Sequence, residues 1–398
     1  MKKYYTLALA LLVLFSCISI EYPPESEHLP ELGLEPEPLP EIAPVPEEPA
    51  LYELSLIAAG DNLIHITMIN SSLKDGVYNF SPVYSEVKDI ISRADIAFIN
   101  QETVMAGPRP GYSGYPRFNT PSSMAATLTD LGFTVINHAN NHVMDMGEAG
   151  ILATLDTWDA IPDIACLGIR RKKEQLPPVI TRNNISLGFL SYTFSTNGLP
   201  LPKDKPWMVS MTNRETMTAE IKSLRPLCDF LIVSIHWGDE YTREPNSYQT
   251  NMAAFLAEHS VDLVLGHHPH VLQRVENIKR PDGKQMLCFY SLGNFASNQE
   301  KKETLLGALA YVVFNKREDE TFIGDAGLVP LLTHIEPGYV KTKIYPLYAY
   351  TDELMKNHRL YSRDREFTMN YFNTYLAGLN AKLFTRNPFA PDSGDDNP

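Results

Sequence analysis

Five apolar segments in this chain each end in a cluster of polar residues, and this repeated pattern constrains the fold more than any other feature. The apolar segments are strand-like in length and cover residues 54–59, 95–99, 133–136, 230–235 and 261–265. Helix-like segments lie between them, at residues 82–93, 122–131, 147–158, 213–224 and 248–259. Alternating strands and helices predict an α/β fold with largely parallel central strands.

The later part of the chain has a different pattern. Residues 285–291, 304–315, 327–335 and 339–347 read as successive strands joined by short turns. We expect these strands to form the second half of a sandwich. A helical extension over about 352–383 is expected to pack outside it.

The polar strand ends carry the residue types that bind divalent metals. They are Asp61, His65, Asn100, Glu102, Asn140, Asn141, His142, His236, His267, His268 and His270. In sheets of this class ligands bind at the carboxyl ends of the strands. Imidazole, carboxylate and amide oxygen are ligands for Mn, Zn or Fe. Each cluster taken singly also fits a satisfied turn or a core histidine, so the prediction of a metal site depends on the whole pattern.

Six ordered motifs resemble those of the bacterial capsule-synthesis (CapA, poly-γ-glutamate) family, which belongs to the calcineurin-like metallophosphoesterase superfamily. They are GDNLIH at 60–65, NQE at 100–102, NHANNH at 137–142, IHWG at 235–238, GHHPHVLQ at 266–273 and YSLGNF at 290–295. The resemblance covers about residues 54–299, with a looser continuation to the mid-340s. It implies a four-layer α/β/β/α sandwich, which we place at residues 51–350, with 351–398 as a C-terminal extension and tail.

The resemblance also implies roles for the metal-binding residues. Asp61 and His270 correspond to ligands of a first ion, Glu102 to a bridging acid, and Asn141, His236 and His268 to ligands of a second ion. His65 is a further candidate, although it lies four residues after Asp61 where the superfamily has Asp-x-His. Asn100-x-Glu102 also departs from the usual Gly-Asp-x-x-Asp, so the site is expected to hold one or two ions.

The resemblance implies catalytic and substrate-binding residues as well. His142, beside Asn141, corresponds to the histidine that contacts a phosphoryl oxygen or protonates a leaving group. Arg117 and Arg243 are candidates for binding an anionic substrate through bidentate contacts, and surface salt bridges are the alternative role for both. Asn294 is placed with the substrate-binding residues, and we expect it to shape the site through hydrogen bonds and not to bind metal.

The N-terminus predicts export. Two lysines precede an apolar run at residues 7–15, and Ser16-Cys17 follows. This resembles a lipobox, so residues 1–17 are predicted to be a lipoprotein-type signal peptide with Cys17 lipidated, which would place the protein outside the cytoplasm on a membrane. An ordinary secretory signal is the alternative. The Pro- and Glu-rich residues 18–50 are predicted to be a disordered, extended linker.

The charge distribution argues against nucleic acid as a partner. Nine of the 48 acidic residues lie between Glu21 and Glu48, which leaves 39 acids against 34 basic residues in the rest of the chain. The sequence contains no basic stripe or recognition motif.

Three functions remain open at this point. The first is a metal-dependent hydrolase or transferase acting on a phosphoester or an anionic envelope polymer. The second is a capsule-assembly factor that handles poly-γ-glutamate or a related polymer beside membrane partners. The third is a non-enzymatic surface lipoprotein. Ligation by this chain alone is disfavoured, because the sequence contains no ATP-binding Gly-x-x-x-x-Gly-Lys-Ser/Thr loop.

Overall fold

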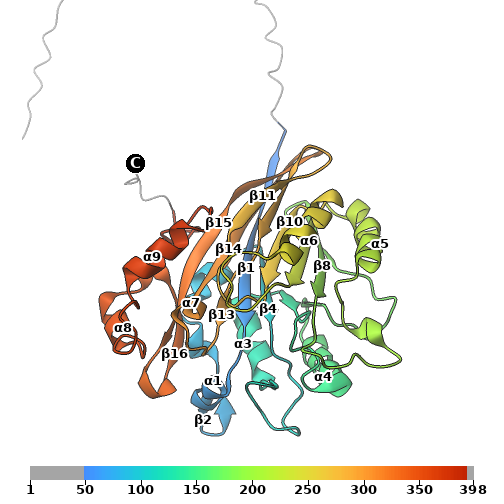
Figure 1. Ribbon diagram of the computed structural model, residues 1–398. Helices are drawn as coiled ribbons and strands as arrows, with labels where there is room; N and C mark the ends of the chain where they lie inside the picture. Colours follow the sequence, from blue (N-terminus) through green and yellow to red (C-terminus); the bar gives the residue numbers. More distant parts are fainter. Residues whose placement is uncertain (1–48, 392–398) are drawn as a thin grey trace, which may run out of the picture. The chain divides into compact units, whose positions relative to one another are not determined.

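The computed structural model describes residues 49–391, which belong to one compact unit (Figure 1). The predicted signal peptide, Cys17 and the predicted linker up to residue 48 lie outside the described residues, as do residues 392–398. Within the described part, no helix is long and apolar enough to span a membrane.

The first sheet is built around the first strand of the fold. Its strands are β1 (Leu51–Asn62), β4 (Ile96–Gln101), β5 (Val135–Asn137), β6 (Ala165–Leu167), β13 (Asn294–Ala296), β14 (Leu306–Arg317), β15 (Glu320–Ile335) and β16 (Thr342–Pro346). Their order is β16-β15-β14-β1-β4-β5-β6, with β13 beside the end of β1. The strands β1, β4, β5 and β6 are parallel, and β14 is antiparallel to β1.

The second sheet comes from the middle of the chain. Its strands are β7 (Val179–Arg182), β8 (Ile185–Thr193), β9 (Phe230–His236), β10 (Leu263–His267), β11 (Val275–Lys279) and β12 (Gln285–Phe289). Their order is β11-β12-β10-β9-β8-β7, and β8, β9, β10 and β12 are parallel. The largely parallel central strands predicted from the sequence are therefore present in both sheets.

The expectation that the later strands form the second half of the sandwich is wrong for β14, β15 and β16. These strands join the first sheet, because β14 pairs with β1 from Leu51 opposite Arg317 to Ala59 opposite Leu309. Of the four later segments only β12 lies in the second sheet.

The helices between the strands lie close to where the sequence predicts them. The helices are α1 (Ile66–Ser71), α2 (Lys88–Ser92), α3 (Ser123–Leu131), α4 (Gly147–Asp159), α5 (Arg214–Leu224), α6 (Ser247–Glu258), α7 (Lys302–Leu305), α8 (Asp352–Asn357) and α9 (Met369–Ala377). α6 begins with a capping box, in which Asn246 and Gln249 each bond the backbone N–H of the other. Only α2 is much shorter than expected.

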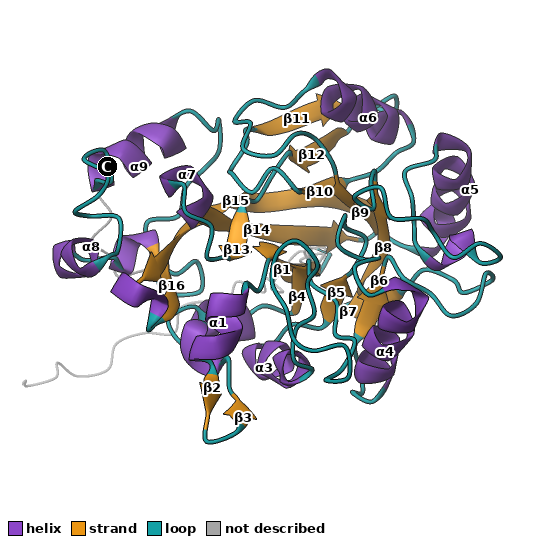
Figure 2. Ribbon diagram, turned by 60° about the horizontal axis from the view of Figure 1, so that its bottom comes forward, coloured by secondary structure: helices purple, strands orange, loops and turns teal. Residues whose placement is uncertain are grey.

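Alternating burial along the strands produces four layers (Figure 2). In β9, Ile232 packs into the core between the two sheets, while Val233 packs on the outer side against α5 and α6. In β1, Leu56 belongs to the same central core, whereas Ile57 packs outward against residues of α1, α2 and α3. Because successive strand residues point to opposite faces, each sheet is buried on both sides. The predicted four-layer α/β/β/α sandwich is confirmed.

The C-terminal helices extend the central core. Phe372 and Leu376 of α9 and Met355 of α8 belong to the cluster that also contains residues of both sheets. α8 and α9 lie beside β15 and β16 (Figure 1). This part of the chain is thus packed against the sandwich, with consequences for the site described below.

Candidate metal centre

The polar residues converge because the strands that carry them end at one edge of the sandwich. In the first sheet Asp61 pairs with Asn100, and Asn100 pairs with Asn137. In the second sheet His236 pairs with His267. The two sheets meet here, with the Asn100 side-chain nitrogen 3.5 Å from Nδ1 of His236.

A close backbone approach positions Asp61. Its N–H donates to the carbonyl oxygen of Gly293 at 2.9 Å. A Cβ atom on the preceding Gly60 would lie 2.0 Å from that oxygen. Only glycine therefore fits at position 60, which gives the Gly-Asp pair of the first motif a structural reason.

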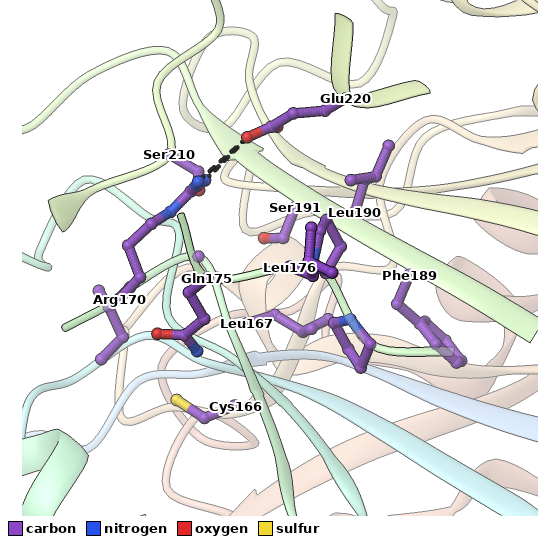
Figure 3. A pocket seen from close by; sticks show the side chains of 14 residues that line it. Cys166, Leu167, Arg170, Gln175, Leu176, Phe189, Leu190, Ser191, Ser210 and Glu220 are labelled. Carbon is purple, nitrogen blue, oxygen red and sulfur yellow. Dashed lines mark hydrogen bonds and ion pairs between the residues drawn. The ribbon is translucent and has the colours of Figure 1, made fainter. Parts of the chain in front are cut away.

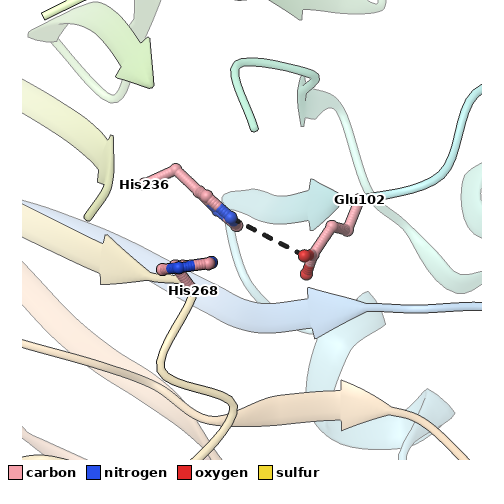
Figure 4. A group of neighbouring side chains, drawn as sticks. All are labelled: Glu102, His236 and His268. Carbon is pink, nitrogen blue, oxygen red and sulfur yellow. Dashed lines mark ion pairs between the residues drawn. The ribbon is translucent and has the colours of Figure 1, made fainter. Parts of the chain in front are cut away.

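Glu102 stands at the centre of the site with two imidazoles nearby. Glu102, His236 and His268 have potential ligand atoms within 4.8 Å of one another (Figure 4). Nε2 of His236 lies 3.6 Å from Oε1 of Glu102, and both side chains are fully buried. This is one group that could hold a cation.

A second group shares the same glutamate. Asp61, Glu102 and His270 also lie within ligand distance of one another. Nδ1 of His270 is 3.1 Å from Oδ2 of Asp61, and Nε2 of His270 is 3.8 Å from Oε1 of Glu102. Asn100 donates to Oδ1 of Asp61 at 2.8 Å. Glu102 therefore occupies the position between the two groups, where a bridging ligand would lie.

The electrostatics of these carboxylates fit a cation. Neither oxygen of Glu102 has a hydrogen-bond partner within residues 49–391. Burial, and then the charge of Asp61, raises the pKa of Glu102 well above its usual range. Burial alone would also raise the pKa of Asp61, but the His267 and His270 imidazoles beside it hold the pKa well below the usual value. A buried carboxylate without a partner is strongly unfavourable, and a divalent ion bound by these residues would satisfy it.

Asn141 lies beside the group of Glu102, His236 and His268, with its amide oxygen toward that group. Oδ1 of Asn141 accepts a hydrogen bond from Nε2 of His236 at 2.9 Å, and its side-chain nitrogen donates to Oδ1 of Asn197 at 3.1 Å. The amide is thus oriented with its oxygen toward His236, as an oxygen ligand beside that imidazole requires.

The backbone of the GHHPHVLQ motif is strained. His268 has φ 98° and His270 has φ 59°, values that side-chain-bearing residues rarely adopt. The strain places the two histidines in different groups around Glu102, although a third group of Glu240, His268 and His270 contains both. Strained backbone of this kind is typical of functional sites. Glu240 is a candidate ligand that we did not predict. Its position two residues after the IHWG motif could have indicated it.

His142 is held by an acid that also contacts the backbone. Nδ1 of His142 lies 2.8 Å from Oδ2 of Asp145, and the same oxygen accepts the N–H of Phe118 at 2.7 Å. The Phe118 ring packs edge-on against the imidazole at 4.7 Å between centroids. These contacts occupy Nδ1 and leave Nε2 available for chemistry.

A cavity of about 380 Å³ lies beside the two groups. It is lined by His65, Arg117, His142, Asp145, Glu240 and His270, among others. Arg117 is exposed in this cavity and forms no ion pair with any residue from 49 to 391. The cavity therefore offers a cationic side chain and the His142 imidazole on the wall of the candidate metal centre.

The structure does not bring His65 into a ligand group or Arg243 into the cavity. His65 lines the cavity, but its Nδ1 lies 3.1 Å from the Leu63 carbonyl oxygen, and burial lowers its pKa to about 4. Because His65 lies four residues after Asp61, it stands at the N-cap position of α1. It belongs to none of the three ligand groups found in residues 49–391. Arg243 does not line the cavity, because its guanidinium stacks 3.7 Å from the ring centre of Tyr375.

Asn294 supports the site from behind. Its Oδ1 is 3.0 Å from Nδ1 of His270, and its side-chain nitrogen donates to Gln299 and to the Thr304 carbonyl, both at 2.9 Å. With its polar atoms bonded inside the protein, Asn294 positions His270 and does not line the cavity.

A separate small pocket lies near β6 and β8 (Figure 3). Its charged residues, Arg170 and Glu220, pair at 3.1 Å, and Glu220 also accepts from Tyr192 at 2.6 Å. These groups satisfy one another, which distinguishes this pocket from the centre around Glu102.

The charge balance of the centre predicts proton release on metal binding. Burial by itself lowers the pKa of His270, but Glu102 and Asp61 raise it to about 9. Since a metal binds the neutral imidazole, Zn²⁺ binding at pH 7 is expected to release at least about one proton, with affinity rising up to pH 9. Calorimetry in two buffers of different ionisation enthalpy measures this number. A value of zero would contradict it.

A four-layer α/β sandwich with carboxylate, imidazole and amide side chains gathered at its strand ends has a metallophosphoesterase-like fold. Residues 55–299 match the model of the bacterial capsule synthesis protein PGA_cap family, and the chain belongs to that family. The resemblance seen in the six motifs is thus confirmed.

The chain is similar to named proteins over part of its length. The chain is 32% identical over 196 residues to the PGA biosynthesis protein CapA of Bacillus subtilis (strain 168), which covers 48% of this chain and 49% of that protein. It is 31% identical over 211 residues to the capsule biosynthesis protein CapA of Bacillus anthracis, covering 51% and 49%. The chain therefore spans about half the length of these relatives. The solved calcineurin-like phosphoesterase YfkN from Bacillus subtilis is 11% identical, with a TM-score of 0.41, covering 82% of this chain and 100% of that one.

Proposed function

We propose that this chain is an exported, membrane-anchored capsule-synthesis protein that uses a divalent-metal centre in the synthesis, transport or trimming of an anionic envelope polymer such as poly-γ-glutamate. The observation that carries the proposal is Glu102. It is a fully buried carboxylate without a hydrogen-bond partner in the described chain, and it lies between two groups of potential ligands. The names of the CapA relatives support the choice of polymer.

The residues that would hold Mn, Zn or Fe follow from the two groups. Asp61, Glu102 and His270 would hold one ion, and Glu102, Asn141, His236 and His268 would hold the other. When bound, such ions polarise a substrate oxygen and make water a nucleophile at neutral pH. Asp145 would keep the His142 imidazole oriented, with Nε2 available to donate a proton to the leaving group. This makes His142 the proposed general acid.

The proposed location depends on the N-terminal sequence. The signal-peptide pattern of residues 1–17 and the cysteine at its end support export and a lipid anchor at Cys17, with secretion as the alternative. Membrane proteins of a capsule machinery are the proposed partners. The acidic and proline-rich stretch that follows would hold the folded domain away from the membrane.

A second candidate is a phosphoester hydrolase with an unidentified substrate. It is favoured by the shared carboxylate between two ligand groups, because two-metal sites are widespread among phosphatases and nucleases. A non-enzymatic binding module is the third. Metal analysis of the purified protein, hydrolysis of an aryl phosphodiester with and without chelator, and retention on poly-γ-glutamate separate the three.

Each outcome favours one function. Bound metal with retention on the polymer, or its cleavage, supports the capsule proposal. Bound metal with chelator-sensitive phosphodiester hydrolysis and no retention favours the second candidate. Absence of metal, hydrolysis and retention would leave only the binding module.

Arg117 provides a test of substrate binding. Replacing Arg117 with alanine should raise KM for an anionic substrate about tenfold or more, because a charge-assisted hydrogen bond would be lost, with a smaller effect on kcat. Arg243→Ala is the matched control, since that arginine stacks on Tyr375 away from the cavity. Steady-state kinetics on whichever substrate these assays show to be turned over measures both variants. If the two variants had equal KM values, Arg117 would be an exposed surface residue with no role in substrate binding.

A further inference from the structure

A short segment connects the metal centre with the C-terminal part of the chain. Residues 299–304, here called the connecting segment, begin at the last residue of the family match and include the start of α7. We infer that residues 358–371 position His270 for metal binding through this connecting segment. The inference rests on the proposed metal centre and extends it to a part of the chain that the family model does not match.

The inner side of the connecting segment contacts the metal centre. Gln299 and the Thr304 carbonyl each accept a hydrogen bond from the Asn294 side chain at 2.9 Å. Asn294 is 1% exposed, and its Oδ1 lies 3.0 Å from Nδ1 of His270. When Nδ1 carries its proton toward Asn294 and Asp61, Nε2 is the nitrogen directed at Glu102. A partner that fixes the second nitrogen of a ligand imidazole sets the orientation of the ring.

Gln299 and Lys301 also fix the tyrosine beside His270. The Gln299 side-chain nitrogen lies 3.3 Å from the hydroxyl of Tyr241, and Nζ of Lys301 lies 4.0 Å from the centre of that ring. The Tyr241 ring packs against the His270 imidazole at 6.1 Å between centroids. The connecting segment thus reaches His270 by two routes, one through Asn294 and one through Tyr241.

The outer side of the connecting segment is held by ion pairs around a largely buried lysine. Nζ of Lys302 lies 3.1 Å from Asp364 and 3.0 Å from Glu366, and it also lies 4.8 Å from the ring centre of Tyr371. The Lys302 side chain is only 13% exposed. Asp364 and Glu366 are 30% and 73% exposed, but Lys302 itself is little exposed, so its two ion pairs hold it more firmly than a pair between two fully exposed side chains would.

The neighbouring acids repeat this arrangement. Glu300 accepts from the Tyr339 hydroxyl at 2.6 Å and from Arg359 at 3.1 Å, and the Arg359 side chain is 7% exposed. Glu303 accepts from the Tyr371 hydroxyl at 2.5 Å. Residues 299 and 301 therefore face the metal centre, whereas 300, 302 and 303 bind the later part of the chain. Loosening the outer contacts should let Gln299 and Thr304 move relative to Asn294.

The test is the Zn²⁺ affinity of the metal-stripped full chain. Lys302→Met removes the charge and keeps the length of the side chain. Loss of a direct support of a ligand weakens metal binding by about 10–100-fold, so this more distant change is expected to weaken it about five- to tenfold. Lys302→Arg should restore the affinity. Competition with a chromophoric chelator measures the dissociation constants.

Lys316→Met is the matched control. Lys316 pairs with Asp229 at 2.8 Å and has 27% of its side chain exposed, but it belongs to β14 and forms no ion pair with the connecting segment within residues 49–391. Thermal unfolding without metal reports the loss of stability in both variants. Only Lys302→Met should also weaken Zn²⁺ binding.

The outcomes separate this inference from the proposed function. Zn²⁺ affinity within twofold of wild type in Lys302→Met, or an equal loss in Lys316→Met, would overturn the inference and leave the metal centre intact. A wild-type chain that binds no divalent metal would overturn the proposed function, and the inference with it.

Discussion

Glu102→Gln is expected to abolish tight metal binding and to reduce any metal-dependent activity at least about 10³-fold. Glu102 is the only carboxylate that belongs to both buried ligand groups found in the described chain. Its replacement by an amide keeps the size and removes the charge that would bind two ions. Metal analysis and turnover of the purified variant measure the two effects.

The same substitution has an unusual expected effect on the metal-free protein. Burial raises the pKa of Glu102 above its usual value, so ionisation of Glu102 destabilises the folded state. This loss of folding free energy is absent below pH 4.5 and grows as the pH rises above that value. Glu102→Gln should therefore be as stable as wild type, or more stable, when both are stripped of metal. The difference should widen with increasing pH, as followed by thermal unfolding.

Glu220→Gln serves as the control for Glu102→Gln. Glu220 is also largely buried, but Arg170 and Tyr192 satisfy it. Its replacement should keep the metal and destabilise the metal-free protein by about 1–3 kcal/mol. If Glu102→Gln kept its metal, or destabilised the stripped protein as Glu220→Gln does, Glu102 would be a structural residue.

His142→Ala is expected to reduce kcat about 10²- to 10⁴-fold while leaving metal content unchanged. The reason is that His142 lies on the cavity wall, outside the ligand groups of the described chain, with Nδ1 held by Asp145. Loss of a general acid has an effect of this size. Steady-state kinetics and metal analysis of the same preparation separate catalysis from binding.

The leaving group provides the control for His142. A substrate whose leaving group needs no proton should be much less sensitive to His142→Ala than one with a poor leaving group. Asp145→Asn, which removes the charge that orients the imidazole, should give an intermediate loss. If His142→Ala instead lost its metal, His142 would have to be reassigned as a ligand.

Much of the fold could be predicted because its signals are local. The apolar strands and the helices between them follow from neighbouring residues. The sheet to which β14, β15 and β16 belong could not be predicted in this way. It depends on the pairing of β14 with β1, which are about 250 residues apart in sequence, and nothing in either strand alone specifies the other.

The candidate site shows the same division. The sequence by itself determined that Asp61 and Glu102 gather at the strand ends of one sheet, and His236 and His268 at those of the other. The packing of the two sheets then brings the two pairs together. Only the tertiary structure decided that Arg243 turns away toward Tyr375 and that Asn294 and the connecting segment support His270. Those outcomes depend on packing between distant segments, whose contacts leave no periodic trace in the sequence.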